Sequence, residues 1–451
     1  MQKCDFVHVY WRRYIMEETT ARKQSWIRQH YHWVIFAAVF LENLLYTSIA
    51  NNCYTLFLRP ITTDLGISRS SFALYSTFAM IPGFCSNLVF ARFHKRVGYR
   101  KIVSILLIMF ACMMVCYSRA QGVIPFYIGS ASFAFAAAFV STAGISRLIT
   151  NWFCKHRGLV LGIVLAASGL GPSLGSMVLT AIMEAHSWRM AYLAAAGIVL
   201  IGVTLVFLFV RDTPQEMGLR PFGENDAQQT AKAHSQKEPV RAWDGIQLSL
   251  LKTRPHFYIM VAAILISCCA TYVVYPTLVS HMQDLGMPMS KAAQIQSFMF
   301  LFLAAAKVLE GSLSDRFGAK RVLVLCIGSC IVGSVILATA SSYGVAVLGV
   351  AIFSFALAES TIMLPVLVED VYGIADQSAI LGIFLAFARL ATGLGPTIGN
   401  FAYDAMGSYT AIYYIMAAVT TGTLVLFWIA VRGADREKKR MMQKNQGNPK
   451  S

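Results

Sequence analysis

Four ionisable side chains lie inside long apolar stretches of this sequence: Glu42, Lys307, Glu359 and Arg389. Such a side chain is costly in an apolar helix unless it meets a counter-charge, a ligand or water. Lysine and arginine there suit an anion, because a guanidinium offers two parallel donors to a carboxylate and an ammonium adds a point charge. A desolvated carboxyl group can take up and release a proton. We therefore predict anion binding by Lys307 and Arg389, and proton coupling by Glu42 and Glu359.

Each assignment has a structural alternative. Lys307 and Glu310 are three residues apart, so they can form a local pair on one helix. Arg389 can instead form an internal ion pair with Glu359, and each glutamate can serve as the partner of an intramembrane cation. The sequence leaves these alternatives open.

Three tyrosines accompany the charged residues. Tyr46 is one helical turn from Glu42, and Tyr272 and Tyr275 precede Pro276. Their hydroxyl groups are candidate donors to a substrate, with aromatic packing as the alternative role.

The surrounding elements are predicted to be membrane-spanning helices. The 451 residues are 57% hydrophobic and 13% charged, against about 25% charge in a typical soluble protein. Apolar segments long enough to cross a hydrocarbon core of about 30 Å recur along the chain, and a lone strand there would leave its backbone unpaired. We identify twelve such segments: 31–57, 69–91, 102–118, 122–148, 157–183, 188–210, 256–280, 292–314, 321–340, 344–368, 377–403 and 409–431. The predicted fold is all-α and polytopic.

The distribution of basic residues predicts the orientation. If the N-terminus is cytoplasmic, 30 of the 38 Lys and Arg residues fall in cytoplasmic segments and 5 in the opposite loops. Cytoplasmic loops carry such an excess. Both termini are therefore expected in the cytoplasm, and the net charge of +16 does not indicate nucleic-acid binding.

The two halves of the chain repeat each other. RVGYRK at 96–101 matches RFGAKR at 316–321, and GLGPSLG at 169–175 matches GLGPTIG at 393–399. Duplicated halves are typical of transporters with a substrate site between them. The expected divisions are an N-terminal segment (1–30), a six-helix bundle (31–211), a cytoplasmic linker (212–255), a second six-helix bundle (256–432) and a basic tail (433–451).

These motifs resemble the major facilitator superfamily across essentially all twelve helices. The family signature Gly-x-x-x-Asp-Arg-x-Gly-x-Arg/Lys-Arg/Lys is present between helices 8 and 9 as Gly311, Asp315, Arg316, Gly318, Lys320 and Arg321. In the first half, Ala91 and Lys95 replace the glycine and the aspartate, while Arg96, Gly98, Arg100 and Lys101 remain. The resemblance implies two pseudo-symmetric bundles, and gating by Gly311, Asp315, Arg316, Gly318, Arg96 and Gly98.

Within that superfamily the sequence looks most like the oxalate–formate antiporter and monocarboxylate transporter-like branch. NWFCKHRGLVLGI at 151–163, HMQDLGMPMSKAA at 281–293 and GLGPTIGNFAYDAMGSY at 393–409 carry this likeness. Such antiporters hold a dianion with one arginine and one lysine on helices 8 and 11. Lys307 and Arg389 occupy the corresponding places with their identities exchanged.

The resemblance implies secondary active transport of a small organic anion, a mono- or dicarboxylate, across the cytoplasmic membrane, as antiport or proton symport. The alternatives are proton-coupled transport of a cationic or amphipathic solute and a non-transporting sensor on the same scaffold. Protons or a counter-anion are the expected coupling partners of a chain that acts as a monomer in the lipid bilayer.

No enzymatic chemistry is indicated. The Gly-x-Ser-x-Gly pattern at 171–175 lies inside a predicted membrane helix, where it suggests a kink and close packing. The sequence has no nucleotide-binding lysine loop, HExxH motif or CxxC pair, so no cofactor or metal is expected.

Overall fold

The computed structural model describes residues 30–50, 52–140, 142–154, 157–223, 245–373 and 376–446. The first group of elements, here the N bundle, is α2 (Tyr31–Ala50), α3 (Asn52–Thr55), α4 (Leu58–Leu65), α5 (Arg69–Val97), α6 (Tyr99–Ser118), α7 (Ile124–Val140), α8 (Thr142–Trp152), α9 (Arg157–Ala185), α10 (Trp188–Phe209) and the 3₁₀ helix η1 (Pro214–Met217). The second group is α12 (Leu248–Leu251) and the C bundle: α13 (Pro255–Asp284), α14 (Met289–Phe317), α15 (Ala319–Ala338), α16 (Tyr343–Tyr372), α17 (Gln377–Met406) and α18 (Tyr409–Gln446). The predicted segment 1–30 lies almost entirely outside the described residues, as does much of the linker.

The membrane-spanning character of these helices is confirmed. Nine helices of the described residues are long and apolar enough to cross a membrane, and α16 is a tenth, in which Tyr343–Glu359 and Thr361–Tyr372 meet at 50°. Pro365 lies inside α16, and a proline removes a backbone hydrogen bond and bends a helix. α5, and α7 followed by α8, occupy the other two predicted segments. The predicted all-α polytopic fold is correct.

Inside the N bundle, α2 and α9 approach each other closely at glycines. A Cβ atom on Gly171 would collide with the Leu44 carbonyl oxygen, and one on Gly175 would collide with that of Ser48. Asn52 Nδ2 also donates to the Pro172 carbonyl oxygen at 2.8 Å. The 171–175 motif therefore lies within a continuous helix and brings two backbones together, as predicted.

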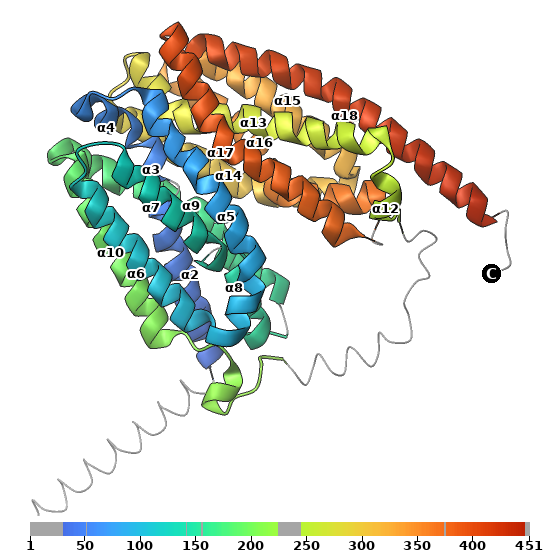
Figure 1. Cartoon of the computed structure of the whole chain (residues 1–451), viewed down its shortest axis with the longest axis horizontal. Helices are drawn as coiled ribbons and strands as arrows, with labels where there is room; N and C mark the ends of the chain where they lie inside the picture. Colours follow the sequence, from blue (N-terminus) through green and yellow to red (C-terminus); the bar gives the residue numbers. More distant parts are fainter. Residues whose placement is uncertain are drawn as a thin grey trace, which may run out of the picture.

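The two bundles contact each other along two helix pairs, α5 with α17 and α9 with α14. We call the end of the molecule where α2 and α13 begin the linker end, and the opposite end the far end. Two of the bonds between the bundles lie in the far-end halves of these helices: Thr77 Oγ1 donates to the Gly393 carbonyl oxygen at 3.2 Å, and Ser297 Oγ donates to that of Ser173 at 2.8 Å. Toward the linker end the bundles diverge (Figure 1).

The described ends of the linker are hydrogen-bonded to equivalent places in the two bundles. The Phe222 N–H donates to the Trp152 carbonyl oxygen, and the Ile246 N–H donates to that of Tyr372, both at 2.8 Å. Trp152 and Tyr372 are 220 residues apart, which is the spacing of the RVGYRK and RFGAKR repeat. Each bundle thus carries its own attachment point for the linker.

The last helix is longer than the sequence predicted. The sequence predicts an apolar segment that ends at 431 and a separate tail from 433, but α18 continues to Gln446 (Figure 1). Its two acidic side chains form ion pairs with the start of other helices: Asp435 with Lys320 at 2.6 Å and Glu437 with Arg254 at 2.9 Å. These pairs attach the polar part of α18 to the C bundle.

We expect Gly175→Ala to destabilise the protein in detergent by about 1–3 kcal/mol, because its methyl group forces α2 and α9 apart. Gly197→Ala is the matched control, since Gly197 is exposed on α10 and a Cβ there meets open space; its effect should stay within about 0.5 kcal/mol. Thermal unfolding of the two variants measures the difference. Equal melting temperatures would show that the close approach is not structurally required.

Candidate functional site

Lys307 lies where α14 leaves its contact with α9. One and two turns toward the far end on the same face, Ala304 and Phe300 pack against Gly169 of α9. The half-buried Lys307 Nζ donates to Ser168 Oγ at 3.3 Å. The lysine therefore reaches across to the other bundle.

Arg389 has the equivalent position on the other helix pair. Gly393, one turn farther along the same face of α17, packs against Met80 of α5. Arg389 itself is exposed. Among the described residues no ion pair engages its guanidinium, so the alternative pair with Glu359 is not formed.

Two of the predicted tyrosines lie between these cations and the far end. Tyr272 of α13 packs against Gly395 of α17, where a Cβ would lie 2.7 Å from the Tyr272 backbone. Tyr275 meets the ring of Phe300 on α14 edge-on at 5.9 Å, and the two tyrosine rings are 6.1 Å apart. Gly395 is six residues from Arg389, and Phe300 is seven residues from Lys307. Each separation corresponds to about 9–10 Å along the helix. The half-buried tyrosines thus connect α17 and α14 on the far-end side of the two cations.

The local pair of Lys307 with Glu310 is absent from the described ion pairs, which extend to 4.0 Å. Glu310 is fully buried, and its Oε1 accepts a hydrogen bond from Cys326 Sγ of α15 at 3.4 Å. Lys307 therefore directs its ammonium group to α9, and Glu310 directs its carboxyl group into the C bundle.

The two predicted proton carriers lie in different bundles. Glu359 of α16 is buried, and its Oε2 accepts from Ser267 Oγ of α13 at 3.0 Å. Glu42 is buried beside the Tyr99 hydroxyl at the beginning of α6. The structure therefore does not gather both carboxyl groups at one site.

Tyr46 also lies apart from the cations. Its buried ring packs between Phe110 of α6 and Phe133 of α7, with centroid distances of 5.9 and 6.0 Å. The N-bundle interior accounts for this ring, as the packing alternative proposed.

The predicted gating residues lie at the linker end. Gly98 and Gly318 precede α6 and α15 with φ angles of +82° and +84°, which an L-residue with a side chain rarely adopts. Asp212 packs against Gly98 and accepts the Arg100 backbone N–H at 2.8 Å. Gly311 lies within α14, and Arg316 is exposed near the Phe317 ring. The side chains of Arg96 and Asp315 lie outside the described residues.

A charged contact of two hydrogen bonds joins the bundles at the far end, and none of its residues is among the predicted site residues. Arg69, the first residue of α5, donates two hydrogen bonds to Asp284 at the end of α13, at 2.7 and 3.0 Å. The same guanidinium lies 4.0 Å from the centre of the Tyr403 ring, and the next backbone N–H, of Ser70, donates to Asp404 Oδ2 at 3.0 Å. We call Arg69, Asp284, Tyr403 and Asp404 the far-end latch.

A duplicated tripeptide signals this latch. Asp-Leu-Gly occurs at 64–66 and again at 284–286, with the 220-residue spacing of the repeat. The first copy acts within one bundle, because Asp64 binds Arg189 at 2.5 Å and Trp188 Nε1 at 3.1 Å. Hydrogen bonds from Arg189 and Trp188 lower the pKa of the Asp64 carboxyl. The second copy joins the bundles.

A buried network of side-chain amide and hydroxyl groups also joins the two bundles. Gln296 Nε2 of α14 donates to Asn52 Oδ1 at 3.0 Å and to Thr55 Oγ1 at 2.5 Å. Ser176 of α9 donates to the same Asn52 oxygen at 2.9 Å. This network joins α3 and α9 of the N bundle to α14 of the C bundle, in addition to the contacts of the far-end latch.

Comparison with known proteins agrees with this arrangement. The sequence profile of the Major Facilitator Superfamily matches residues 38–306 and 260–450. The chain therefore belongs to that superfamily of membrane transporters.

Its curated relatives are distant. The chain is similar to monocarboxylate transporter 12-B of Danio rerio, with 23% identity over 315 residues, and the match spans only 65% of that relative's length and of this chain. It is also similar to multidrug resistance protein MdtG of Proteus mirabilis, with 23% identity over 92% of this chain and 99% of the relative. The crystal structure of the nucleoside transporter NupG shares the fold, with a TM-score of 0.66, 15% identity, and coverage of 89% of this chain and 98% of that one.

We expect Asp284→Asn to loosen the far end, because it removes the charge from a two-bond contact between the bundles. Loss of a charge-assisted contact of about 1.5–3 kcal/mol should favour the open far end by roughly 10- to 100-fold. The measurement is the labelling rate of a cysteine at Ala73, a buried residue of α5, with a thiol reagent in detergent and in a cysteine-depleted chain.

Asp64→Asn is the control, since it removes the same charge from a pair within one bundle. It should leave labelling at position 73 unchanged. The latch assignment is wrong if both variants accelerate labelling equally.

Proposed function

We propose that the protein is a secondary active transporter of a small organic anion, a mono- or dicarboxylate, that works by alternating access. The observation that carries the proposal is the exposed Arg389 guanidinium on the face of α17 that turns toward α5. Arginine stays charged at any accessible pH, so an exposed guanidinium at this depth can bind an anionic ligand. The monocarboxylate name of the Danio rerio relative supports the same substrate class.

The charge distribution supports a cytoplasmic linker end. Of the 38 Lys and Arg residues, 30 belong to the sequence segments predicted to be cytoplasmic and 5 to the opposite loops. In this orientation the protein is a multi-pass protein of the cytoplasmic membrane with both termini inside. The far-end latch then closes the outer side, and Arg389 and Lys307 are approached from the cytoplasm.

The substrate would bind where the helix pairs diverge. Arg389 can hold one carboxylate through two parallel hydrogen bonds, and Lys307 can supply the second positive charge after leaving Ser168. The Tyr272 and Tyr275 hydroxyl groups, farther toward the far end, are candidate donors to the remainder of the molecule. An anion at this place removes the repulsion between two cations in a low-dielectric site.

Alternation between the two sides would require the far-end latch to open. Substrate binding draws α14 and α17 toward the N bundle at the level of Lys307 and Arg389, while the Arg69–Asp284 contact breaks. The linker-end loops, with Gly98, Gly318 and the Asp315–Arg316 pair of residues, would then close the cytoplasmic side.

Glu359 is our candidate for proton coupling. Its hydrogen bond from Ser267 joins α16 to α13, so its protonation state would alter a contact between two central helices of the C bundle. Glu42 of the N bundle is the second candidate.

A second function is transport of a cationic or amphipathic solute in exchange for protons. The likeness to the multidrug resistance protein, over 99% of that protein's length, favours it. In this case Glu42 and Glu359 would be the counter-charges of the solute.

We expect Arg389→Lys to weaken carboxylate binding by roughly 10- to 100-fold, because it keeps the charge but loses the paired donors. Lys307→Arg should be milder, and Lys307→Gln should shift selectivity from dicarboxylates to monocarboxylates. Uptake of labelled oxalate, succinate and lactate into proteoliposomes, with and without internal counter-substrate, measures each effect. Arg119→Lys, exposed at the end of α6, should behave as the unmodified protein.

The Lys307→Gln and Glu310→Gln double variant separates binding from local pairing. If Lys307 serves only Glu310, the double variant recovers transport that Lys307→Gln alone has lost. We expect no recovery, because the described contacts direct the two side chains apart. Recovery would leave Arg389 as the sole binding cation.

We expect Glu359→Gln to abolish accumulation driven by a pH gradient while leaving exchange of internal for external substrate measurable, because a glutamine cannot carry the proton. Ser267→Ala is the accompanying variant: it should shift the pH at which coupling is half-maximal without abolishing coupling. Full proton-driven uptake by Glu359→Gln would exclude this residue and direct attention to Glu42.

A further inference from the structure

A second kind of site lies on the outer surface of the C bundle, at the linker end. An apolar groove of about 680 Å³ runs between the start of α15 and the middle of α18. Its walls include Val324, Val425 and Trp428, which are 45%, 58% and 54% exposed. Side chains of this kind on a membrane-spanning helix face the lipid, so the groove opens to the bilayer.

The rim of this groove is basic. Lys320 and Arg321 line it, and the Arg432 guanidinium lies 3.6 Å from the centre of the Trp428 ring. Asp435 forms an ion pair with Lys320 at 2.6 Å and so fixes one of the three cations. Arg321 and Arg432 are exposed, and no described ion pair engages either of them.

The rim lies at the depth of lipid headgroups. Arg432 follows Tyr409 by 23 residues of one helix, or about 35 Å, slightly more than the hydrocarbon core of about 30 Å. Lys320 and Arg321 are the second and third residues of α15. Trp428, one turn before Arg432, occupies the interfacial level that tryptophan prefers.

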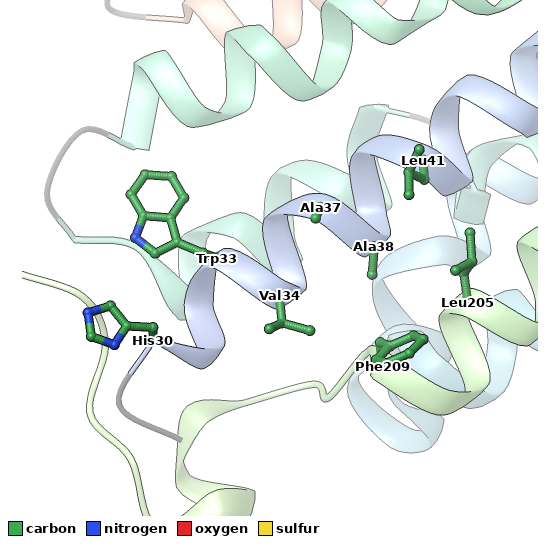
Figure 2. Close-up of a pocket in the computed structure, with 8 residues that line it drawn as sticks. All are labelled: His30, Trp33, Val34, Ala37, Ala38, Leu41, Leu205 and Phe209. Carbon is green, nitrogen blue, oxygen red and sulfur yellow. The ribbon is translucent and has the colours of Figure 1, made fainter. Parts of the chain in front are cut away.

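The basic rim is not a general property of the grooves on this protein. A comparable groove of about 560 Å³ lies between α2 and α10 at the same end (Figure 2). It is lined by His30, Trp33, Val34, Ala37, Ala38, Leu41, Leu205 and Phe209, so its described lining contains no lysine or arginine. The two grooves have similar apolar walls and differ in the charge at the rim.

We propose that the groove between α15 and α18 binds one anionic phospholipid, with an acyl chain along Val324, Val425 and Trp428 and the phosphate at Arg321 and Arg432. The apolar walls match the chain, and the cations match a headgroup with net negative charge. A zwitterionic headgroup adds an ammonium group near the same cations and is disfavoured.

A second copy of the chain fits this surface less well. Two copies related by a two-fold axis would present the same patch to each other. Their basic rims would then face one another across the interface, where like charges repel.

The test is native mass spectrometry of the full-length protein with added phosphatidylglycerol or phosphatidylcholine. We expect phosphatidylglycerol to remain bound in preference to phosphatidylcholine, with one molecule bound more tightly than any further ones. Arg321→Gln with Arg432→Gln should weaken that binding by roughly 10-fold or more, since each basic residue near a membrane surface contributes to anionic-lipid attraction. Lys439→Gln with Arg440→Gln is the control, because it removes the same charge from exposed positions farther along α18.

Val425→Trp provides an independent variant, because it fills the groove and leaves every rim charge in place. It should reduce phosphatidylglycerol binding, whereas Leu205→Trp in the groove of Figure 2 should not. Equal binding of the two lipids by the unmodified protein would overturn the proposal. Unchanged phosphatidylglycerol binding in both Val425→Trp and Leu205→Trp would also overturn it. So would a complex of two chains that Val425→Trp dissociates and Leu205→Trp does not.

Discussion

Among the described residues, the shortest charged contact between the two bundles is made by one arginine that crosses from one to the other, and a second arginine, Arg59, lies 3.9 Å from the same aspartate. Arg69 belongs to the N bundle, but its guanidinium is held by Asp284 and the Tyr403 ring of the C bundle. The other described bonds between the bundles are mostly hydroxyl or amide contacts, each worth about 0.5–1.5 kcal/mol. The charged contact lies at the extreme end of the helices, so it holds the far ends together and lets the linker ends diverge.

Contacts within a bundle are of a different kind. Gly171 and Gly175 bring the backbones of α2 and α9 so close that a methyl group has no room, and van der Waals packing of this kind gives way only when the helices separate. Between the bundles, polar groups that can exchange partners accompany the packing of Gly169 and Gly393. This difference favours motion of the bundles as rigid units about the proposed site at Lys307 and Arg389.

The sequence was informative where a physical rule acts locally. Apolar length predicted the helices, and the cost of a charge in lipid singled out Lys307 and Arg389, which the structure places at equivalent points of the two helix pairs. The sequence was less informative about side-chain contacts, because these depend on which face of a helix meets which neighbouring helix. Tyr46 shares a helix with Glu42, yet its ring packs between Phe110 and Phe133. Arg69 and Asp284 are 215 residues apart, and the internal repeat marks only Asp284, through the duplicated Asp-Leu-Gly tripeptide.

The duplicated Asp-Leu-Gly tripeptide shows how an internal symmetry can be broken at little cost. Both aspartates remain in the chain, one bound to Arg189 of its own bundle and the other to Arg69 of the opposite bundle. The aspartate is the same in both copies. What differs is whether its arginine belongs to the same bundle or to the opposite one. After a gene duplication, an arginine on the facing helix can recruit an aspartate that both halves already carry. Divergence of the two halves could therefore begin at one loop, while every helix of the ancestral bundle kept its packing.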